Sequence, residues 1–107
     1  MGLNQYEIVW VNLDPTQGTE IKKTRPCVII SPDEMNNHLK TVVIAPMTAK
    51  SRNYPTRLKV RFNNKISWVV LDQIRTIDKL RITRKSGTLS NEEITICKAI
   101  IKEAYME

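Results

Sequence analysis

The side chain best placed for chemistry in this sequence is Arg25, which stands between a polar loop and an apolar strand. The loop 17–24 contains the carboxylate of Glu20, and the run 28–30 is typical of a buried strand. Pro26 disfavours a helical conformation for the residue before it, so Arg25 is expected to be extended. A guanidinium at a strand mouth can donate two hydrogen bonds to one phosphate. The segment therefore predicts a phosphate-binding arginine or, more simply, a surface arginine beside a strand.

Further polar side chains stand at the ends of other predicted strands. Thr48 ends one apolar run, and Asp72, Gln73 and Arg75 follow a later one. Because strand ends can converge on one rim of a small barrel, these side chains are expected to share a groove with the first arginine. For Arg75 an alternative stays open, in which an internal ion pair with Asp78 fixes the turn.

The balance of charges favours a polyanionic partner. The chain has 107 residues, with 17 lysines and arginines against 11 aspartates and glutamates, and a net charge of +6. Basic domains often bind nucleic acid, because each neutralised phosphate releases counterions, although net charge also serves solubility alone. The length predicts a single domain, residues 1–107, with one modest core.

Cysteine and histidine usage argues against metal or disulfide chemistry. Cys27 and Cys97 lie far apart in apolar patterns and are predicted to be buried, reduced thiols. His38 is the one histidine and is expected on the surface, so no metal site and no cofactor are predicted. The first residues lack the features of a secretion signal, and no apolar run reaches the roughly 20 residues that cross a membrane. We therefore expect a cytoplasmic protein with no membrane partner.

The hydrophobic patterns predict short strands separated by turns. Strict alternation over 57–62, followed by the turn 63–65, indicates a hairpin. Pro46 is expected to mark a bulge or the exit of its strand. The expected strands cover 6–11, 27–30, 41–48, 57–62 and 66–71, with 80–82 as a sixth candidate.

Two helices complete the predicted α+β domain. Ser31 is expected to cap a short helix that the polar run 36–38 breaks. A capping box at 90–93 starts a C-terminal helix, and its apolar stripe, which includes Ile96 and Ala104, is expected to face the core. The elements together predict a strongly bent β-sheet or small barrel closed by the C-terminal helix.

Four sequence blocks in a fixed order carry a resemblance that spans the chain. They are Gly18-x-Glu20, the run 25–31, Val43-x-x-Pro46-x-Thr48 and the run 71–79. In order and spacing they resemble the MazF/PemK family of toxin endoribonucleases. The resemblance implies an SH3-like barrel and a homodimer that cleaves single-stranded RNA at a short recognition sequence. It also implies a MazE-like antitoxin whose acidic C-terminal tail covers the RNA groove, and DNA binding through that complex.

The same resemblance implies a metal-independent reaction, in which the 2′-hydroxyl attacks the adjacent phosphate and leaves a 2′,3′-cyclic phosphate and a 5′-hydroxyl. Arg25 would stabilise the phosphorane and deliver the proton to the leaving oxygen, and Thr48 would hydrogen-bond the scissile phosphate. Glu20 and Asp72 are the candidate general bases. Some relatives carry an arginine two positions before the Asp72 equivalent, whereas this chain has Val70, which moves the expected catalysis to the first two residues. RNA contacts are expected from Gln73, Lys22, Lys23, Arg75 and Lys50.

Two functions without catalysis remain as alternatives. A topoisomerase poison like CcdB would depend on C-terminal residues such as Tyr105 and Met106. An RNA-binding barrel would tolerate the loss of Arg25 and would use aromatic platforms. Trp10 and Trp68 both lie in strand patterns, however, and are predicted to pack in the core.

Overall fold

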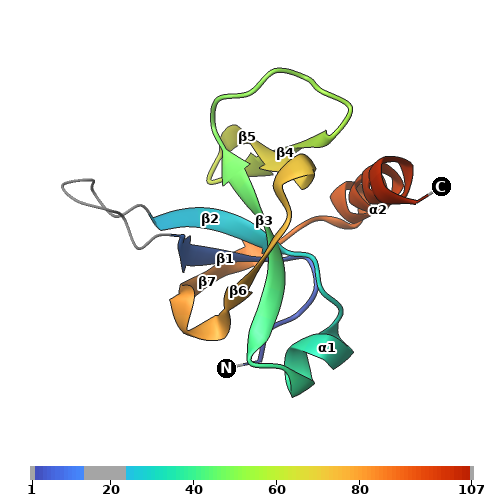
Figure 1. Ribbon diagram of the computed structural model, residues 1–107. Helices are drawn as coiled ribbons and strands as arrows, with labels where there is room; N and C mark the ends of the chain where they lie inside the picture. The colour runs from blue at the N-terminus through green and yellow to red at the C-terminus, as the bar shows by residue number, and fades with distance from the viewer. Residues whose placement is uncertain (1, 14–23, 107) are drawn as a thin grey trace, which may run out of the picture.

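Short antiparallel strands form the larger part of the secondary structure, as the computed structural model shows over residues 2–13 and 24–106 (Figure 1). Residues 1, 14–23 and 107 lie outside the described part of the chain, and with them the predicted site residues Glu20, Lys22 and Lys23. Within the described part, the elements are β1 (Glu7–Asn12), β2 (Thr24–Ile29), α1 (Asp33–His38), β3 (Thr41–Thr48), β4 (Arg57–Phe62), β5 (Lys65–Val70), the 3₁₀ turn η1 (Leu71–Gln73), β6 (Arg75–Asp78), the 3₁₀ turn η2 (Lys79–Arg81), β7 (Ile82–Thr88) and α2 (Asn91–Tyr105).

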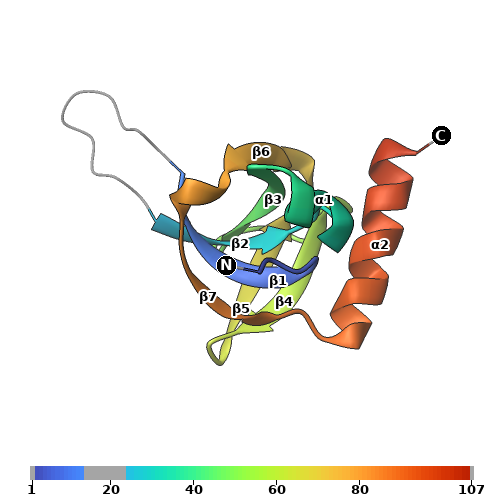
Figure 2. The ribbon, with the colours of Figure 1, turned by 90° about the horizontal axis from the view of Figure 1, so that it is seen from below.

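The bend of the sheet is centred on β3. The strands pair in the order β4-β5-β3-β2-β1-β7, and β6 adds to the first half of β3. One edge of β3 pairs with β6 over 41–44 and then with β5 over 47–48, while the other edge pairs with β2. The sheet curls into a half-barrel with α2 along one side (Figure 2). The predicted strongly bent sheet, with a short helix after the second strand and a C-terminal helix, is confirmed.

Both faces of the first strands are covered, which explains why their sequences are nearly continuously apolar. On one face Ile8 and Val28 join a cluster that α2 completes with Cys97. On the other face Val9 and Cys27 join a second cluster. Both cysteines are buried free thiols, as predicted, and burial raises the pKa of Cys27 to about 12 and that of Cys97 to about 11. They therefore stay protonated and pack as small apolar side chains.

The start of α1 differs from the predicted cap. Pro32 occupies the N-cap position, and no side chain caps the helix. The Ser31 hydroxyl instead donates to the buried Asn36 side chain at 2.5 Å and accepts from the Val43 amide at 3.0 Å. The Asn36 amide in turn donates to the Ser31 carbonyl at 2.9 Å. The polar run 36–38, which was expected to break the helix, therefore forms its second half. The Asn36 side chain is hydrogen-bonded to Ser31, in the segment that connects β2 to α1. The helix ends at His38.

Pro46 lies inside its strand, so the prediction of a bulge or strand exit is wrong. It pairs opposite Cys27, and β3 continues to Thr48. On the opposite edge of β3 the pairs with β6 stop at 44 and those with β5 begin at 47. A residue without an N–H is tolerated at this gap between two partner strands.

The sixth predicted strand is also wrong in its position. The segment Lys79–Arg81 is a 3₁₀ turn, in which the Asp78 side chain accepts from the Leu80 amide at 2.8 Å. The strand β7 starts only at Ile82 and runs to Thr88. Its sequence has almost no apolar alternation, because β7 is an edge strand of the sheet and most of its side chains are exposed.

The C-terminal helix begins as predicted and covers the sheet along a narrow stripe. Ser90 and Glu93 form the expected capping box. Cys97 is the buried residue of the helix, and apolar neighbours along the same stripe pack beside it. Ile96 and Ala104 are exposed, so the predicted core-facing stripe is narrower than the sequence indicated.

Candidate functional site

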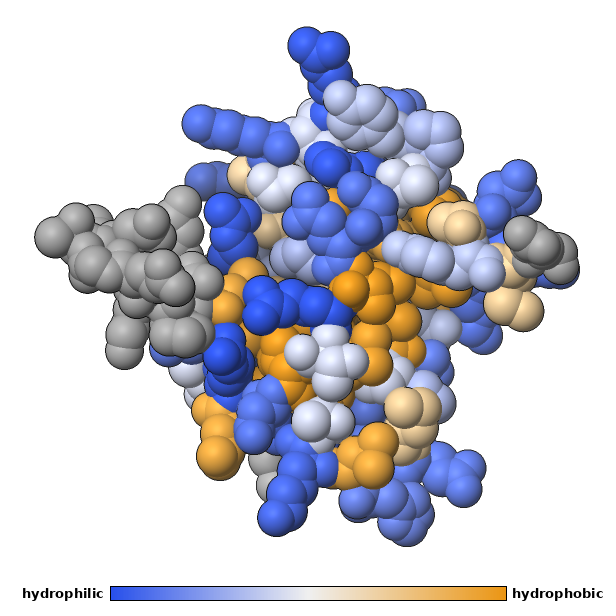
Figure 3. Space-filling model, in the orientation of Figure 1, coloured by the Kyte–Doolittle hydropathy of each residue, from blue (hydrophilic) through white to orange (hydrophobic). Residues whose placement is uncertain are grey.

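A cavity of about 450 Å³ opens where the ends of several strands meet the turn η1. Four cationic side chains line it, and no acidic one does among the residues that the structure describes. We call this cavity the basic pocket. Five residues that the sequence predicts as site residues line it together: Arg25, Thr48, Lys50, Gln73 and Arg75. On the face drawn in Figure 3, apolar side chains gather at the centre and hydrophilic ones surround them.

Strand register explains why Arg25 and Thr48 meet. Cys27 in β2 pairs with Pro46 in β3, and Arg25 and Thr48 each lie two residues farther along these antiparallel strands. Because a spacing of two returns a side chain to the same face, both project to one side of the sheet. Arg75 reaches that side from β6, which pairs with the edge of β3. Burial is the main reason why the pKa of the Cys27 thiol is raised, and the positive charges of Arg25 and Arg75 act in the opposite direction.

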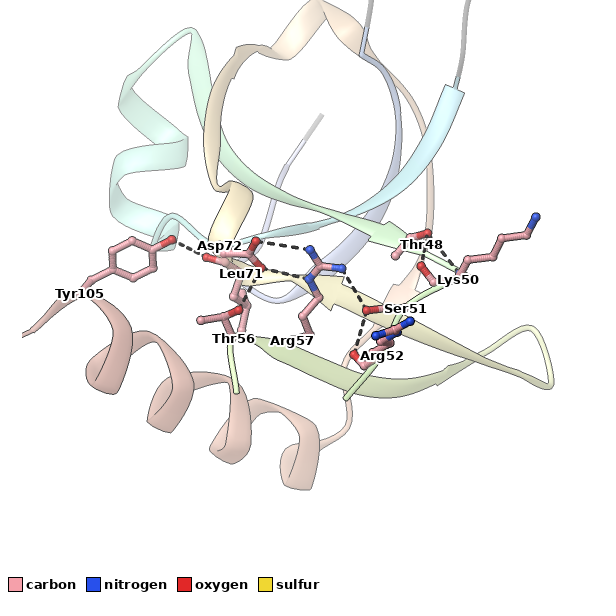
Figure 4. Close-up of polar contacts among 9 residues, drawn as sticks. All are labelled: Thr48, Lys50, Ser51, Arg52, Thr56, Arg57, Leu71, Asp72 and Tyr105. Carbon is pink, nitrogen blue, oxygen red and sulfur yellow. Dashed lines mark hydrogen bonds and ion pairs between the residues drawn. The ribbon is translucent and has the colours of Figure 1, made fainter. Parts of the chain in front are cut away.

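The hydroxyl of Thr48 is held at the end of β3 by the backbone that follows it. It accepts from the Lys50 amide at 3.2 Å and donates to the Lys50 carbonyl at 3.3 Å (Figure 4). The Ser67 hydroxyl donates to the Thr48 carbonyl at 3.2 Å and so ties this strand end to β5. These bonds fix the position of the Thr48 oxygen, while its half-buried side chain stays at the pocket wall.

The pocket's fourth cation, Arg57, is held by a network that spans β4 and η1. Its Nε donates to Oδ1 of Asp72 at 3.1 Å, and its Nη1 donates to the Ser51 hydroxyl at 3.0 Å (Figure 4). The Thr56 hydroxyl donates to the same Asp72 oxygen at 3.1 Å. The hydrogen bond from Arg57 is the main reason why the pKa of Asp72 is lowered. The carboxylate is thus ionised at neutral pH and is a weak proton acceptor.

Two residues of the predicted site have other surroundings than expected. Asp72 does not line the basic pocket, since its carboxylate is turned to Arg57 and Thr56. Arg75 lines the pocket and makes no ion pair with Asp78 among the described residues, where Asp78 caps η2 instead. The alternative in which Arg75 and Asp78 form an internal ion pair is therefore wrong.

The described segments show neither a metal cluster nor a membrane-spanning helix. Over residues 2–13 and 24–106, no three His, Cys, Asp or Glu side chains come together as ligands for a metal ion. In the same part of the chain, neither helix has both the length and the apolar character that crossing a bilayer requires.

The basic pocket belongs to a domain with known relatives. Residues 4–105 match the family described as PemK-like, MazF-like toxin of type II toxin-antitoxin system. The chain belongs to this family. It is 32% identical over 96 residues to the protein named Endoribonuclease toxin MazF of Escherichia coli K12. The matched region covers 89% of this chain and 86% of the relative.

Solved structures of MazF proteins have the same fold. The Mycobacterium tuberculosis toxin MazF-mt6 superposes with a TM-score of 0.79 at 26% identity, over 92% of this chain and 95% of the other. The MazE-MazF structure (Form-II) from Deinococcus radiodurans gives a TM-score of 0.81 at 18% identity, over 96% of this chain and 95% of the other, and shows the fold alone.

Arg57 is the site residue that sequence reasoning missed in this MazF-like chain. The alternating pattern of 57–62 indicates only that Arg57 belongs to a strand, although it stands, like Arg25, where a polar loop meets a strand. That shared pattern is the signal that could have identified it. Its partner across the β4–β5 pair is Val70. A guanidinium is therefore present beside this position, supplied by the neighbouring strand.

Proposed function

We propose that this MazF-like protein is an endoribonuclease toxin that cleaves single-stranded RNA in the basic pocket. The observation that carries the proposal is the meeting of Arg25 and Thr48 with three further cations in one cavity. Guanidinium and ammonium groups around a hydroxyl donor suit a phosphodiester, and a pocket of this charge favours a polyanion. The relative named Endoribonuclease toxin MazF, 32% identical over most of the chain, supports the same activity.

The proposed reaction is an internal phosphoryl transfer. The 2′-oxygen forms a bond to the adjacent phosphorus, the bond from phosphorus to the 5′-oxygen breaks, and the products are a 2′,3′-cyclic phosphate and a 5′-hydroxyl. Arg25 donates hydrogen bonds to the non-bridging oxygens as their charge grows, and the Thr48 hydroxyl turns its hydrogen bond from the Lys50 carbonyl to the same phosphate. Preorganised donors of this kind contribute on the order of 100-fold or more each to the rate. Arg57 adds a further positive charge to the pocket wall, held in place by Asp72.

Proton transfer in this scheme requires an acceptor for the 2′-hydroxyl and a donor for the leaving 5′-oxygen. Asp72 is a poor acceptor, because the hydrogen bond from Arg57 lowers its pKa and occupies its carboxylate. The other carboxylate proposed as base, Glu20, lies outside the described residues. Arg25 is the proposed donor to the leaving oxygen, since it lines the pocket beside Thr48.

The proposed partners are a second copy of the chain and an antitoxin with an acidic C-terminal segment. Solved structures of the same fold include MazE-MazF of Deinococcus radiodurans and an endoribonuclease in complex with its cognate antitoxin from a mycobacterial species. The net charge of +6 and the cations of the basic pocket suit an acidic segment that would compete with RNA.

A cleavage assay with matched variants tests the proposal. Purified protein is incubated with a long single-stranded RNA of mixed sequence in EDTA, and the products are mapped by primer extension and end-group analysis. We expect discrete cuts at one short sequence with 5′-hydroxyl ends, lost in Arg25→Ala and retained in Arg61→Ala, whose exposed arginine does not line the pocket. Absence of cleavage by the wild type at high enzyme excess would favour the topoisomerase-poison or RNA-binding alternatives.

A further inference from the structure

A second cavity adjoins the basic pocket at Arg25 and Thr48. It has a volume of about 460 Å³ and shares Arg25, Met47 and Thr48 with the basic pocket. Its remaining walls come mainly from the β4–β5 hairpin, so we call it the hairpin pocket. Arg25 and Thr48, the two residues proposed to bind the scissile phosphate, therefore line two adjoining cavities. The sequence predicts only the first of these cavities.

The walls of the hairpin pocket differ in chemistry from those of the basic pocket. Phe62 and Ile66 supply an aromatic and an aliphatic wall, and Ile66 is 44% exposed although it is apolar. Asn63 supplies an amide, which has both hydrogen-bond donors and an acceptor. Lys65 is the added cation, and no acidic side chain lines this cavity among the described residues. Apolar walls that accept a ring, with an amide at the edge, suit an unstacked nucleobase.

The hairpin pocket is built from fixed parts. Asn63 and Asn64 have φ angles of 51° and 61°, so the hairpin is closed by a two-residue left-handed turn that sets the direction of the Asn63 side chain. Phe62 is braced by Trp10, with ring centroids 6.2 Å apart, and the Arg84 guanidinium lies 4.7 Å from the Trp10 ring. A cavity with such walls requires little ordering when a base enters it.

The hairpin pocket is also tied to the proposed phosphate site. The Ser67 hydroxyl, at its wall, donates to the carbonyl of Thr48 at 3.2 Å. A base next to the scissile bond is joined to that phosphate through one ribose, so it must lie beside the residues that hold the phosphate. The hairpin pocket meets this requirement because Arg25 and Thr48 form part of its own wall.

We propose that the hairpin pocket holds the nucleobase next to the scissile phosphate and selects its identity through Asn63, with Phe62 and Ile66 as its apolar walls. This inference rests on the proposed function, and it assigns part of the sequence preference to the β4–β5 hairpin. Amide side chains distinguish bases because a bidentate pair with one base edge leaves unpaired groups on another.

The test is the cleavage profile of a randomised single-stranded RNA library, read by sequencing the new 5′-hydroxyl ends. Asn63→Gly keeps the left-handed turn and removes the amide, and Asn64→Gly makes the same change at the next position, which does not line the pocket. We expect Asn63→Gly to relax the preference at one position beside the cut by about tenfold, in line with the discrimination of an amide–base pair. Asn64→Gly should leave the profile unchanged.

Each outcome of this experiment decides between the two proposals. An unchanged profile in folded Asn63→Gly, or an equal change in Asn64→Gly, overturns the hairpin pocket as a base site and leaves the nuclease intact. If Asn63→Gly lowers the thermal midpoint so far that it cannot be assayed, Ile66→Ala decides. A KM raised about fivefold with kcat retained supports the base site, in line with the loss of apolar contact area, and an unchanged KM overturns it. A wild type that cuts no member of the library overturns both proposals.

Discussion

Arg57 and Asp72 are joined in a two-point ion pair, with Nε and Oδ1 3.1 Å apart and Nη2 and Oδ2 3.4 Å apart. The pair links the first residue of β4 to the turn η1, across the strand pair in which Arg57 faces Val70. Because the fork of a guanidinium matches a carboxylate in one orientation, Asp72 fixes where the Arg57 charge stands in the basic pocket. A role as general base is not needed to explain this aspartate, since a positioning role accounts for its geometry.

The first prediction separates these two roles of Asp72. Asp72→Asn keeps the size of the side chain and one acceptor for Arg57 but removes the charge. We expect single-turnover cleavage to slow by about tenfold, because this change only loosens the position of Arg57. Loss of a general base would typically lower the rate 10²–10⁴-fold. The matched control is Asp33→Asn, an exposed aspartate of α1 outside the pocket. A loss of 1,000-fold or more at saturating RNA would instead make Asp72 the base, on the scale of that principle.

The second prediction concerns pH and the same ion pair. The folded pKa of Asp72 is lowered by the Arg57 hydrogen bond, so the pair stabilises the fold at pH values above the unfolded pKa of about 3.9 and is lost as the pH falls through the folded pKa. We expect urea midpoints of the wild type and Asp72→Asn to differ equally at pH 7 and pH 5 and to converge as the pH falls below the unfolded pKa and through the lowered folded pKa. The difference should be small, because the Asp72 side chain is 36% exposed and water screens the pair. A difference that grows as the pH falls would contradict this assignment.

The contrast between Arg25 and Arg57 shows what the sequence can reveal about the site. Arg25 could be predicted because proline and an apolar run follow it, and strand ends of a bent sheet converge. Arg57 opens a strand as well, but its approach to the pocket depends on β3 sharing one edge between β6 and β5, which no local pattern encodes. The sequence does not predict the hairpin pocket for the same reason, since its walls at Phe62 and Asn63 meet Thr48 only through the curl of the sheet.

The third prediction measures the contribution of Lys50 to RNA binding. The hydrogen bonds between Lys50 and Thr48 use backbone atoms of Lys50, so Lys50→Ala removes the charge and leaves the Thr48 hydroxyl in place. For single strands, each neutralised phosphate contributes about −0.7 to the slope of log K against log salt. We expect Lys50→Ala to reduce the slope by about this amount with an uncleavable 2′-deoxy oligonucleotide. Lys102→Ala, on α2 and outside the pocket, should keep the wild-type slope.

The last prediction tests whether the end of α2 supports the site or binds a partner. The Tyr105 hydroxyl donates to the carbonyl of Leu71, the first residue of η1, and Asp72 follows directly (Figure 4). Tyr105→Phe leaves the ring and removes this bond, so we expect a loss of about 0.5–1.5 kcal/mol in the free energy of unfolding, measured by urea denaturation. Met106→Ala is the control, since Met106 is 67% exposed and follows the helix. An unchanged stability in Tyr105→Phe would mean that its hydroxyl does not brace η1, and it would then be available to a partner, as the topoisomerase-poison alternative requires.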